Sequence, residues 1–422
     1  MQVKVLDDKT YDAYALKSPY VSIYSISKWG DLKEYTGWKK HLLGVYDGDE
    51  VIGVTSLLEK KLPLGQSLFY SPRGYLTDVH DENKLKSFHE SIIKYVKDNH
   101  GFMLKVDPNA VYNLRNSDGD ILKCVGRDVY DNFLHLGFKH LGFTQNFETL
   151  QPRYLCRIKL GKTYDETLMT FTKSTRKNII KTEEMGVRVK VVQEDKIDEF
   201  VSLLQNTASE KHFVIRPVSY YKRQYELLKD YMKLYIAYID TDAYYKYVVN
   251  SIEEIKNELD NLNKEMKKIN VGDKIRQKKS SLERKIKVME DKVFEAENLK
   301  KIGKEINIGA LMSVFINNEG ITFMSGTTSS YKEFNPKYAF YNKHIKDSID
   351  MNLEYVNFYG ISGDMDKHGP YYGIYEMKKG FNPEILELVG EFDYIINYSV
   401  YYAYKFALWG YKLKKRICDC RK

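Results

Sequence analysis

The chain has few cysteines, no long apolar run and no recognisable leader, and each absence removes a class of protein. Four cysteines in 422 residues are too few for a disulfide framework, and the close pair Cys418 and Cys420 has no second pair of ligands nearby to complete a metal site. No stretch approaches the roughly 18–20 apolar residues that span a bilayer. The opening residues, MQVKVLDDKTYDAY, lack the charged-then-apolar layout of a signal peptide. We therefore expect a cytoplasmic protein that uses no metal and no other cofactor.

Neither sign of charge dominates, because 66 basic and 58 acidic residues leave a net charge of +8. This mild excess permits an anionic partner such as RNA, a nucleotide-linked sugar or a membrane surface, but it does not require one. A length of 422 residues is enough for two or three domains. The 36 tyrosines are better explained by the composition of an AT-rich genome than by a stacking role.

The middle of the chain carries the apolar spacing of a coiled coil. Residues 252–269 read IEEIKNELDNLNKEMKKI, and a turn signal, NVGD, separates them from a second stretch that continues the heptad. The seam residues of the two stretches are Ile252, Ile255, Leu259, Leu262, Met266 and Ile269, then Ile275, Leu282, Ile286, Met289 and Val293. The pattern predicts an antiparallel hairpin of two helices, each roughly 40 Å long at about 1.5 Å per residue.

The hairpin should project from a sheet, because a strand-like stretch flanks it on each side, at 234–240 and 306–317. Residues 246–301 contain 15 basic and 11 acidic residues, a net charge of +4. Three roles for the arm stay open on these grounds: cradling tRNA, docking a partner enzyme, or stiffening its own sheet.

Each half of the chain repeats one order of elements: three strands, a helix and a strand. In the first half the elements are expected at 41–60 (two strands around a turn at 47–49), 67–71, 82–99 and 102–106. In the second half they are expected at 234–240, 306–317, 320–325, 336–351 and 355–359. An antiparallel meander that leads into a βαβ crossover is the centre of a GNAT-like acyltransferase fold.

We therefore predict an α/β (α+β) protein with two GNAT-like subdomains and an inserted antiparallel coiled-coil arm. The expected divisions are a first subdomain over 1–150, a second over 151–245 and 302–395, the arm over 246–301, and a C-terminal segment with a basic tail over 396–422.

The glycine-rich turn that holds the pyrophosphate of coenzyme A is missing. Acetyl-CoA-dependent enzymes of this fold place such a turn before a helix, so that backbone amides bind the phosphates. The two expected helices are preceded here by LTDVHDENK and TTSSYKEFNPK, which contain no such sequence. Coenzyme A is therefore disfavoured as acyl donor, and aminoacyl-tRNA is the obvious alternative for a basic cytoplasmic protein.

Ten segments in order along the chain resemble the FemABX family of non-ribosomal peptidyltransferases. They lie at 27–38 (SKWGDLKEYTGW), 104–112, 136–143, 150–160, 173–189 (KSTRKNIIKTEEMGVRV), 215–221 (IRPVSYY), 323–331 (FMSGTTSSY), 358–364 (FYGISGD), 372–381 (YGIYEMKKGF) and 389–397. Each segment is weak alone, but the order and the place of the arm make the set specific. Length and arm resemble most the FemX/FmhB members.

The resemblance implies transfer of Gly, Ala or Ser from aminoacyl-tRNA to a peptidoglycan precursor, either lipid II or its UDP-linked form. The acceptor would be the side-chain amine of the third stem-peptide residue, a Lys or a diaminopimelate, and the product the interpeptide bridge. It further implies a monomer that can touch the inner face of the membrane. The alternatives are an acyl-CoA-dependent GNAT acyltransferase and a non-catalytic tRNA-binding scaffold on the same fold.

The same resemblance proposes residues for the reaction. Lys378, in YEMKKGF, would lie at the reaction centre and stabilise the oxyanion or hold the tRNA end, and Lys379 could take that role instead. Asp107, in KVDPN, would act as base or anchor the acceptor amine, although an Asp before Pro is often only a turn former.

A second group would bind the acceptor. Lys33 and Arg216 resemble the two basic residues that hold its phosphates and carboxylates, with Trp29 on the same helix face as Lys33. Tyr220 and Phe323 complete this group.

A third group would contact tRNA phosphate. Arg176, Lys177 and Lys181 lie in an expected amphipathic helix whose apolar side includes Ile179 and Ile180. A solvated helix face explains the same charges equally well.

Overall fold

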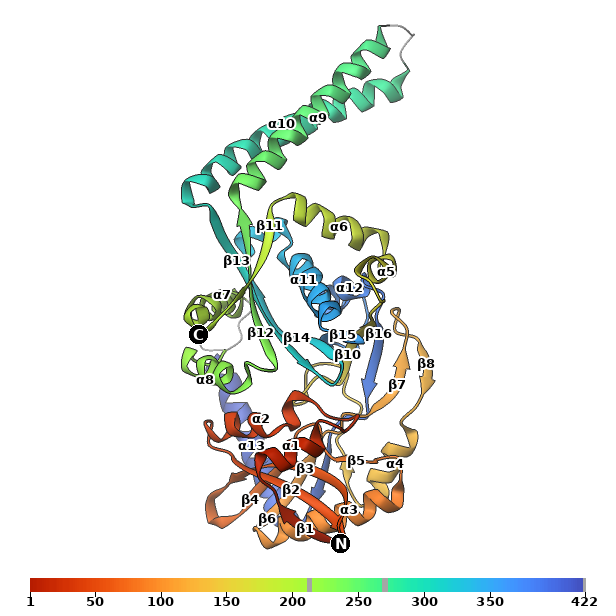
Figure 1. The fold of residues 1–422 in the computed structure, drawn as a ribbon, viewed down its shortest axis with the longest axis vertical. Coiled ribbons are helices and arrows are strands. Elements are labelled where there is room, and N and C mark those ends of the chain that lie inside the picture. The colour runs from red at the N-terminus through yellow and green to blue at the C-terminus, as the bar shows by residue number, and fades with distance from the viewer. Residues whose placement is uncertain (211–214, 268–271, 420–422) are drawn as a thin grey trace.

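The computed structural model describes residues 1–210, 215–267 and 272–419. Two sheets stacked along the long axis form the body, and a helical hairpin projects from one end (Figure 1). We call the elements on the first sheet the first lobe and those on the second sheet the second lobe. None of the helices described is both long and apolar enough to cross a membrane.

The first sheet has the strand order β1-β2-β3-β4-β6-β17-β9, with β5 beside β3. Its strands are β1 (Gln2–Val5), β2 (Lys39–Asp47), β3 (Glu50–Lys61), β4 (Ser67–Ser71), β5 (Leu76–Thr77), β6 (Gly101–Val106), β9 (Lys139–His140) and β17 (Phe392–Ile395). The strands β2, β3 and β4 form the predicted antiparallel meander, and β6 lies parallel to β4 after the helix α3 (Glu82–Asp98). The Asp81 carboxylate accepts the Lys84 backbone N–H at 3.0 Å and so starts α3 at its predicted place.

The second sheet has the strand order β11-β12-β13-β14-β15-β10-β16-β7-β8. Its strands are β7 (Val111–Arg115), β8 (Ile121–Cys124), β10 (Tyr154–Lys159), β11 (Val187–Val192), β12 (Met232–Asp240), β13 (Glu305–Ile316), β14 (Glu319–Thr327), β15 (Tyr355–Ile361) and β16 (Glu384–Leu388). The meander β12-β13-β14 and the parallel strand β15, reached through the helix α11 (Pro336–Asp350), repeat the arrangement of the first sheet. Parallel pairing of β14 with β15 covers only three residues of each strand, so the two strands diverge beyond Asn357.

The two sheets exchange strands. β7 and β8 follow β6 in the chain but pair into the second sheet, and β17 returns from the second lobe to pair with β6 in the first. Hydrogen bonding therefore crosses the positions 150 and 395 at which the subdomain boundaries were predicted. Those boundaries stay a prediction, because sheet membership alone does not define a domain.

The remaining helices cover the sheets or join them. They are α1 (Asp8–Ala15), α2 (Ser27–Glu34), α4 (Arg127–His135), α5 (Tyr164–Met169), α6 (Lys173–Glu184), α7 (Ile197–Glu210), α8 (Val218–Leu228), α12 (Tyr372–Lys379) and α13 (Tyr398–Asp419), with short 3-10 turns η1 (Ile23–Ser25), η2 (Pro63–Gly65), η3 (Glu194–Lys196) and η4 (Ser329–Phe334). One apolar core joins Leu32 of α2 to Phe200 of α7 and Tyr221 of α8. Helices of the first lobe are thus packed into a core of the second.

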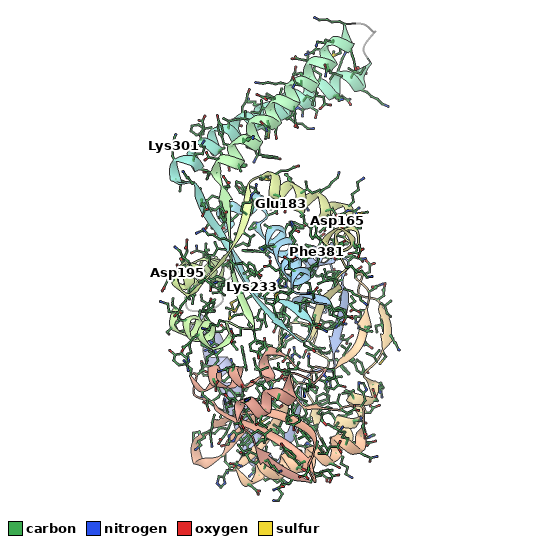
Figure 2. The ribbon with its side chains drawn as sticks, viewed as in Figure 1. Asp165, Glu183, Asp195, Lys233, Lys301 and Phe381 are labelled. Atoms are coloured by element: carbon green, nitrogen blue, oxygen red, sulfur yellow. The ribbon has the colours of Figure 1, made fainter. Side chains whose placement is uncertain are left out.

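The arm consists of α9 (Thr241–Met266) and α10 (Asp273–Ile302), inserted between the paired strands β12 and β13 (Figure 1). Ile252, Leu262 and Leu282 of the predicted seam are buried, which confirms the coiled-coil arm. Ile269 and part of the predicted turn lie outside the described residues. The base of the arm, marked by Lys301 in Figure 2, differs from the tip in what its side chains pack against.

Four residues at this base belong to the core of the second lobe. They are Tyr244, Val248, Ala296 and Leu299. The base, against which Met289 and Val293 also pack, is therefore part of the fold, whereas the outer part of the arm buries its own seam.

Removing the outer arm should leave the body folded. We expect that a chain in which residues 253–286 are replaced by a short Gly-rich turn keeps its thermal midpoint within a few degrees. Leu299→Ala, in contrast, should lower the free energy of unfolding by about 2–5 kcal/mol because it opens a cavity in the core. Chemical denaturation followed by circular dichroism compares the two. Equal losses of stability would contradict the separation of base and tip.

Candidate active site between the lobes

A cavity of ≈ 440 Å³ lies between the two lobes. The loop before α2 supplies one wall and the exposed face of the second sheet the other. Its lining includes Tyr20, Tyr24, Arg73, Asn109, Leu155, Arg157, Phe323, Asn357, Tyr359 and Leu388. Because both lobes contribute to the lining, the site exists only when they are packed together.

Two tyrosines close the contact across this cavity. The hydroxyls of Tyr24 and Tyr359 share a short hydrogen bond, and that of Tyr359 also donates to Gln151 Oε1 at 3.1 Å. Tyr359 has φ 63°, in the left-handed region that costs free energy for a non-glycine residue. Its backbone N–H donates to Asn357 Oδ1 at 2.8 Å, which holds this conformation. The sequence reasoning missed both tyrosines, although Tyr359 stands in the quoted segment FYGISGD.

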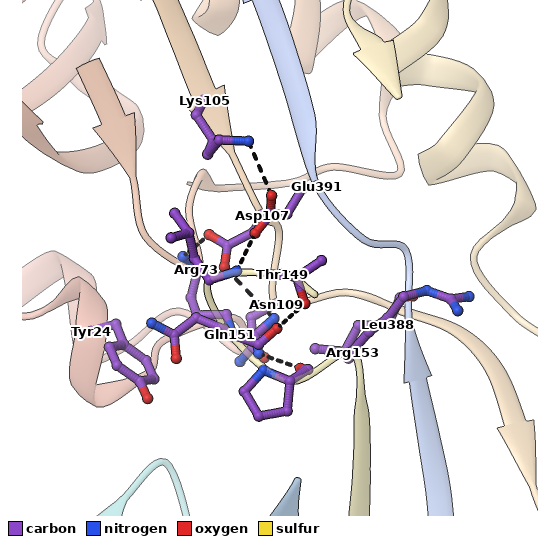
Figure 3. Close-up of polar contacts among 12 residues, drawn as sticks. Tyr24, Arg73, Lys105, Asp107, Asn109, Thr149, Gln151, Arg153, Leu388 and Glu391 are labelled. Atoms are coloured by element: carbon purple, nitrogen blue, oxygen red, sulfur yellow. Dashed lines mark hydrogen bonds and ion pairs between the residues drawn. The ribbon is translucent and has the colours of Figure 1, made fainter. Parts of the chain in front are cut away.

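Asp107 lies directly after β6, beside Arg73 (Figure 3). Its Oδ1 accepts the Arg73 backbone N–H at 2.8 Å, and the Arg73 Nη1 lies 4.0 Å from Oδ2. The Arg73 Nη2 donates to the Pro152 carbonyl oxygen at 2.7 Å, which leaves the guanidinium at the cavity wall. Nothing in the sequence pointed to Arg73, because only the fold brings this residue beside Asp107.

Burial raises the pKa of Asp107 to about 6, against the opposing effect of Arg73. The carboxyl is 2% exposed, and within the part of the chain that is described its Oδ2 has no hydrogen bond of normal geometry. A carboxylate with a raised pKa and a free oxygen is a better proton acceptor than an ordinary Asp.

A cationic cluster lies next to the cavity. The Lys33 ammonium stands 4.4 Å from the ring centroid of Trp29 and 6.0 Å from that of Tyr220, and the Arg216 guanidinium lies 5.6 Å from the same Tyr220 ring. Trp29 in turn contacts Phe323 of the cavity wall, with ring centroids 6.3 Å apart. The fold thus brings together five of the six residues predicted to bind substrate, from α2, the α8 region and β14; the sixth, Lys379, lies elsewhere, beside Asp118.

Lys33 is partly buried, and among the residues described no carboxylate forms an ion pair with its ammonium. Burial, and secondly the charge of Arg216, lower the pKa of Lys33 to about 8. Across residues 1–210, 215–267 and 272–419, neither Lys33 nor Arg216 forms an ion pair. Two adjacent cations without a counter-charge form a natural anion site.

Lys378 lies on the other face of the second sheet. It sits near the end of α12, and its ammonium donates to the Gly360 carbonyl oxygen at 2.7 Å, where β15 has diverged from β14. Burial lowers its pKa to about 8, while the neighbouring Cys156 thiol opposes this shift. Lys378 does not line the cavity between the lobes, whereas Leu155, next to Cys156, does. Asp107 is not a lining residue either, but its neighbours Arg73 and Asn109 are, so Asp107 lies behind the cavity wall and Lys378 lies on the far face of the second sheet.

The other predicted cations are closer to the surface. Lys379 is bound to the exposed Asp118 at 2.5 Å. On α6, Lys177 and Lys181 are exposed, and Arg176 Nη1 donates to the Met169 carbonyl oxygen at 3.3 Å. The expected apolar side of this helix is wrong in one respect, because Ile180 is 50% exposed and only Ile179 is buried.

Among the residues described, no group of three or more His, Cys, Asp and Glu side chains could hold a metal ion. The side chain of Cys418 and all of Cys420 lie outside them.

A family model described as the FemAB family matches residues 6–408. The chain belongs to the FemAB family. It is 32% identical over 387 residues to Aminoacyltransferase FemA of Staphylococcus epidermidis, covering 89% of this chain and 91% of that protein. It is 30% identical to Aminoacyltransferase FemA of Staphylococcus aureus, covering 96% of this chain and 97% of the relative.

The fold agrees with a solved structure of the same family. The crystal structure of FemX superposes with a TM-score of 0.75 at 24% identity, over 96% of this chain and 99% of FemX. The prediction of a GNAT-like fold with two subdomains is confirmed. This FemAB protein is an aminoacyltransferase that adds amino acids to the peptidoglycan precursor to build the interpeptide bridge, as the family resemblance implied.

Anion binding at the cationic cluster should weaken as pH rises. Below about pH 8, Lys33 is mostly protonated in the free protein. Above that pH, Lys33 must take up a proton before both Lys33 and Arg216 can bind an anion as cations. We expect inorganic pyrophosphate to bind about tenfold more weakly at pH 9 than at pH 7, as one charge-assisted hydrogen bond of about 1.5–3 kcal/mol is lost. Isothermal calorimetry measures this.

The matched control lies on the same helix. Lys33→Gln should bind weakly and without pH dependence, whereas Lys28→Gln, at an exposed position of α2, should behave as the parent protein. A pH dependence that survives in Lys33→Gln would contradict the assignment.

Proposed function

We propose that the nucleophile is the side-chain amine of the third residue of the stem peptide, a Lys or a diaminopimelate, and that the donor is Gly, Ala or Ser esterified to tRNA. The amine nitrogen attacks the ester carbonyl carbon, a C–N bond forms, and the C–O bond to the tRNA ribose breaks. The amine loses a proton in the process, and the ribose oxygen gains one. The observation that carries this proposal is the cationic cluster, which has no counter-charge among the described residues, beside a cavity that both lobes line.

In this proposal the acceptor's phosphates bind at Lys33 and Arg216. Trp29 and Tyr220 hold the two cations by their ring faces, which leaves the N–H donors free for phosphate oxygens. The stem peptide then extends past Phe323 into the cavity. The cavity suits a peptide because its wall alternates aromatic rings with polar groups from both lobes.

Asp107 is the proposed base for the acceptor amine. With a pKa of about 6, Asp107 is ionised at neutral pH and is a stronger base than an exposed Asp. Arg73 keeps the carboxylate in place through its backbone N–H and presents its guanidinium to the cavity. It can therefore hold a carboxylate of the acceptor beside the base.

The donor is assigned to the other face of the second sheet. The pairing of β14 with β15 ends at Asn357, and Lys378 donates to the Gly360 carbonyl oxygen just beyond that point, which is where we place the donor ester. Its ammonium, still mostly protonated at pH 7, would stabilise the oxyanion or the ester of the tRNA end. Lys379 could supply a second charge, and Arg176, Lys177 and Lys181 on α6 would contact the tRNA phosphates.

We further propose that the protein acts as a monomer in the cytoplasm and accepts either lipid II or the UDP-linked precursor. Transfer from acyl-CoA and a purely scaffolding role are both disfavoured by membership of an aminoacyltransferase family.

Transfer itself can be measured with purified components. We expect mass spectrometry of a UDP-linked muramyl pentapeptide, incubated with the protein and a mixture of charged tRNAs, to show the added mass of one Gly, Ala or Ser. Fragmentation should place that mass on the side chain of the third residue. Acetyl-CoA in place of charged tRNA should give no product. Transfer from acetyl-CoA, or addition at another residue, would contradict the proposal.

The role of Asp107 predicts a particular pH profile. Protonation of this carboxyl removes the base, so kcat/KM should fall tenfold for each pH unit below about 6. Asp107→Asn should lower kcat by about 10²–10⁴-fold at pH 7.5, and its residual activity should lack the acidic limb. Asp98→Asn, at an exposed position of α3, is the control. An acidic limb retained in Asp107→Asn would show that another group is the base.

A further inference from the structure

The helix α13 presents an aromatic face that the body leaves uncovered. One side of the helix is fixed, because Tyr401 is buried in a core with Phe102 and Met103 of β6. The adjoining side carries four exposed aromatic residues at helical spacing. They are Tyr398, Tyr402, Phe406 and Trp409, with exposed fractions of 61%, 58%, 71% and 60%. In Figure 1, α13 lies behind α2, at the back of the first lobe.

The outer half of α13 stands clear of the body. All residues from Phe406 to Tyr411 are exposed, and a Cβ placed on Gly410 would meet no atom within 4 Å. The rings of Phe406 and Trp409 contact each other at 5.8 Å between centroids. An exposed aromatic surface of this kind is typical of an interaction site.

The charge of the chain beyond this surface indicates the chemistry of that partner. Residues 412–422 read KLKKRICDCRK, with six basic residues and one acidic residue. Trp, Tyr and Phe rings followed by clustered Lys and Arg are typical of segments that lie in the interface of an anionic bilayer. The clustered excess of positive charge directly after the rings is the reason to assign a lipid surface as the partner.

We propose that the aromatic face of α13 docks on the anionic surface of the membrane. Phe406 and Trp409 insert among the head groups, and the basic residues that follow attract acidic lipids. This proposal deepens the proposed function and rests on it in one respect, since a lipid-linked acceptor would be presented at that surface.

The attachment of α13 connects the docked helix to the active site. The Tyr401 hydroxyl donates to Asp393 Oδ2 at 3.0 Å, and Lys405 Nζ lies 3.2 Å from the same oxygen. Asp393 belongs to β17, whose partner β6 runs directly into Asp107. Docking through α13 would therefore fix the orientation of the cavity relative to the bilayer.

Binding to vesicles tests the proposal with the full chain. We expect the protein to cosediment with vesicles of phosphatidylglycerol and phosphatidylcholine, and at least tenfold less with phosphatidylcholine alone or in 0.5 M salt. Emission from the exposed Trp409 should shift to shorter wavelength on binding. The double variant Phe406→Ser, Trp409→Ser should reduce the bound fraction at least tenfold.

The control removes two aromatic side chains of similar exposure elsewhere. Tyr35→Ser, Phe294→Ser changes residues that are 55% and 66% exposed and should leave binding unchanged. The proposal is overturned if the parent chain does not bind, or if Phe406→Ser, Trp409→Ser binds as well as the parent. It is equally overturned if ultracentrifugation shows a dimer that this variant abolishes, because a second copy would then cover the face.

Transfer to the water-soluble UDP-linked acceptor, measured on the same proteins, separates the two hypotheses. Vesicle binding without transfer to any acceptor overturns the proposed function alone. Transfer without vesicle binding overturns the docking proposal alone.

Discussion

The exchange of strands between the two sheets is the constraint on which the site depends. β16 holds β7 in the second sheet, with Leu386 opposite Leu114, while β6 holds β17 in the first. Each lobe thus contains backbone from segments that are far apart in the chain. A cavity between lobes that are joined in this way has walls fixed by hydrogen-bonded strands, and such walls hold side chains more accurately than loops do.

Charged groups at the candidate site are buried without full pairing by opposite charges. Some buried charges are paired, as where Glu387 accepts from Arg153 and lies 2.6 Å from Arg115. Beside the cavity, within the part of the chain that is described, Asp107 Oδ2 accepts no hydrogen bond and has the Arg73 guanidinium 4.0 Å away, and Lys33 has Arg216 nearby and no carboxylate. Burial without full pairing costs stability, and it is the expected condition of groups that receive a proton or a phosphate from a substrate.

The arm and the helix α13 both extend from the body, but they differ in how much apolar surface they expose to water. The arm buries its apolar seam between α9 and α10 and shows mainly charged residues to water, so it needs no partner for stability. The helix α13 buries one side against β6 and leaves aromatic rings exposed on the adjoining side. Two amphipathic helical segments therefore differ in outcome. The arm covers its apolar residues within itself, whereas α13 leaves aromatic residues exposed to water.

Local periodicity was enough to locate the arm, the helix α3 and the meander of each sheet, because spacing of 3.6 or 2 residues reflects the face that each element buries. Family resemblance supplied the residues of the cationic cluster. Neither source indicated that β7 and β8 join the second sheet, that Arg73 and the pair Tyr24 and Tyr359 line the cavity, or that Lys378 lies on the opposite face from Asp107. These facts depend on contacts between residues far apart in the chain, which no local pattern records. The sequence by itself determined which elements form and which side chains carry chemistry, and the tertiary structure alone decided which of them meet, because strand pairing and lobe packing are set by the whole chain at once.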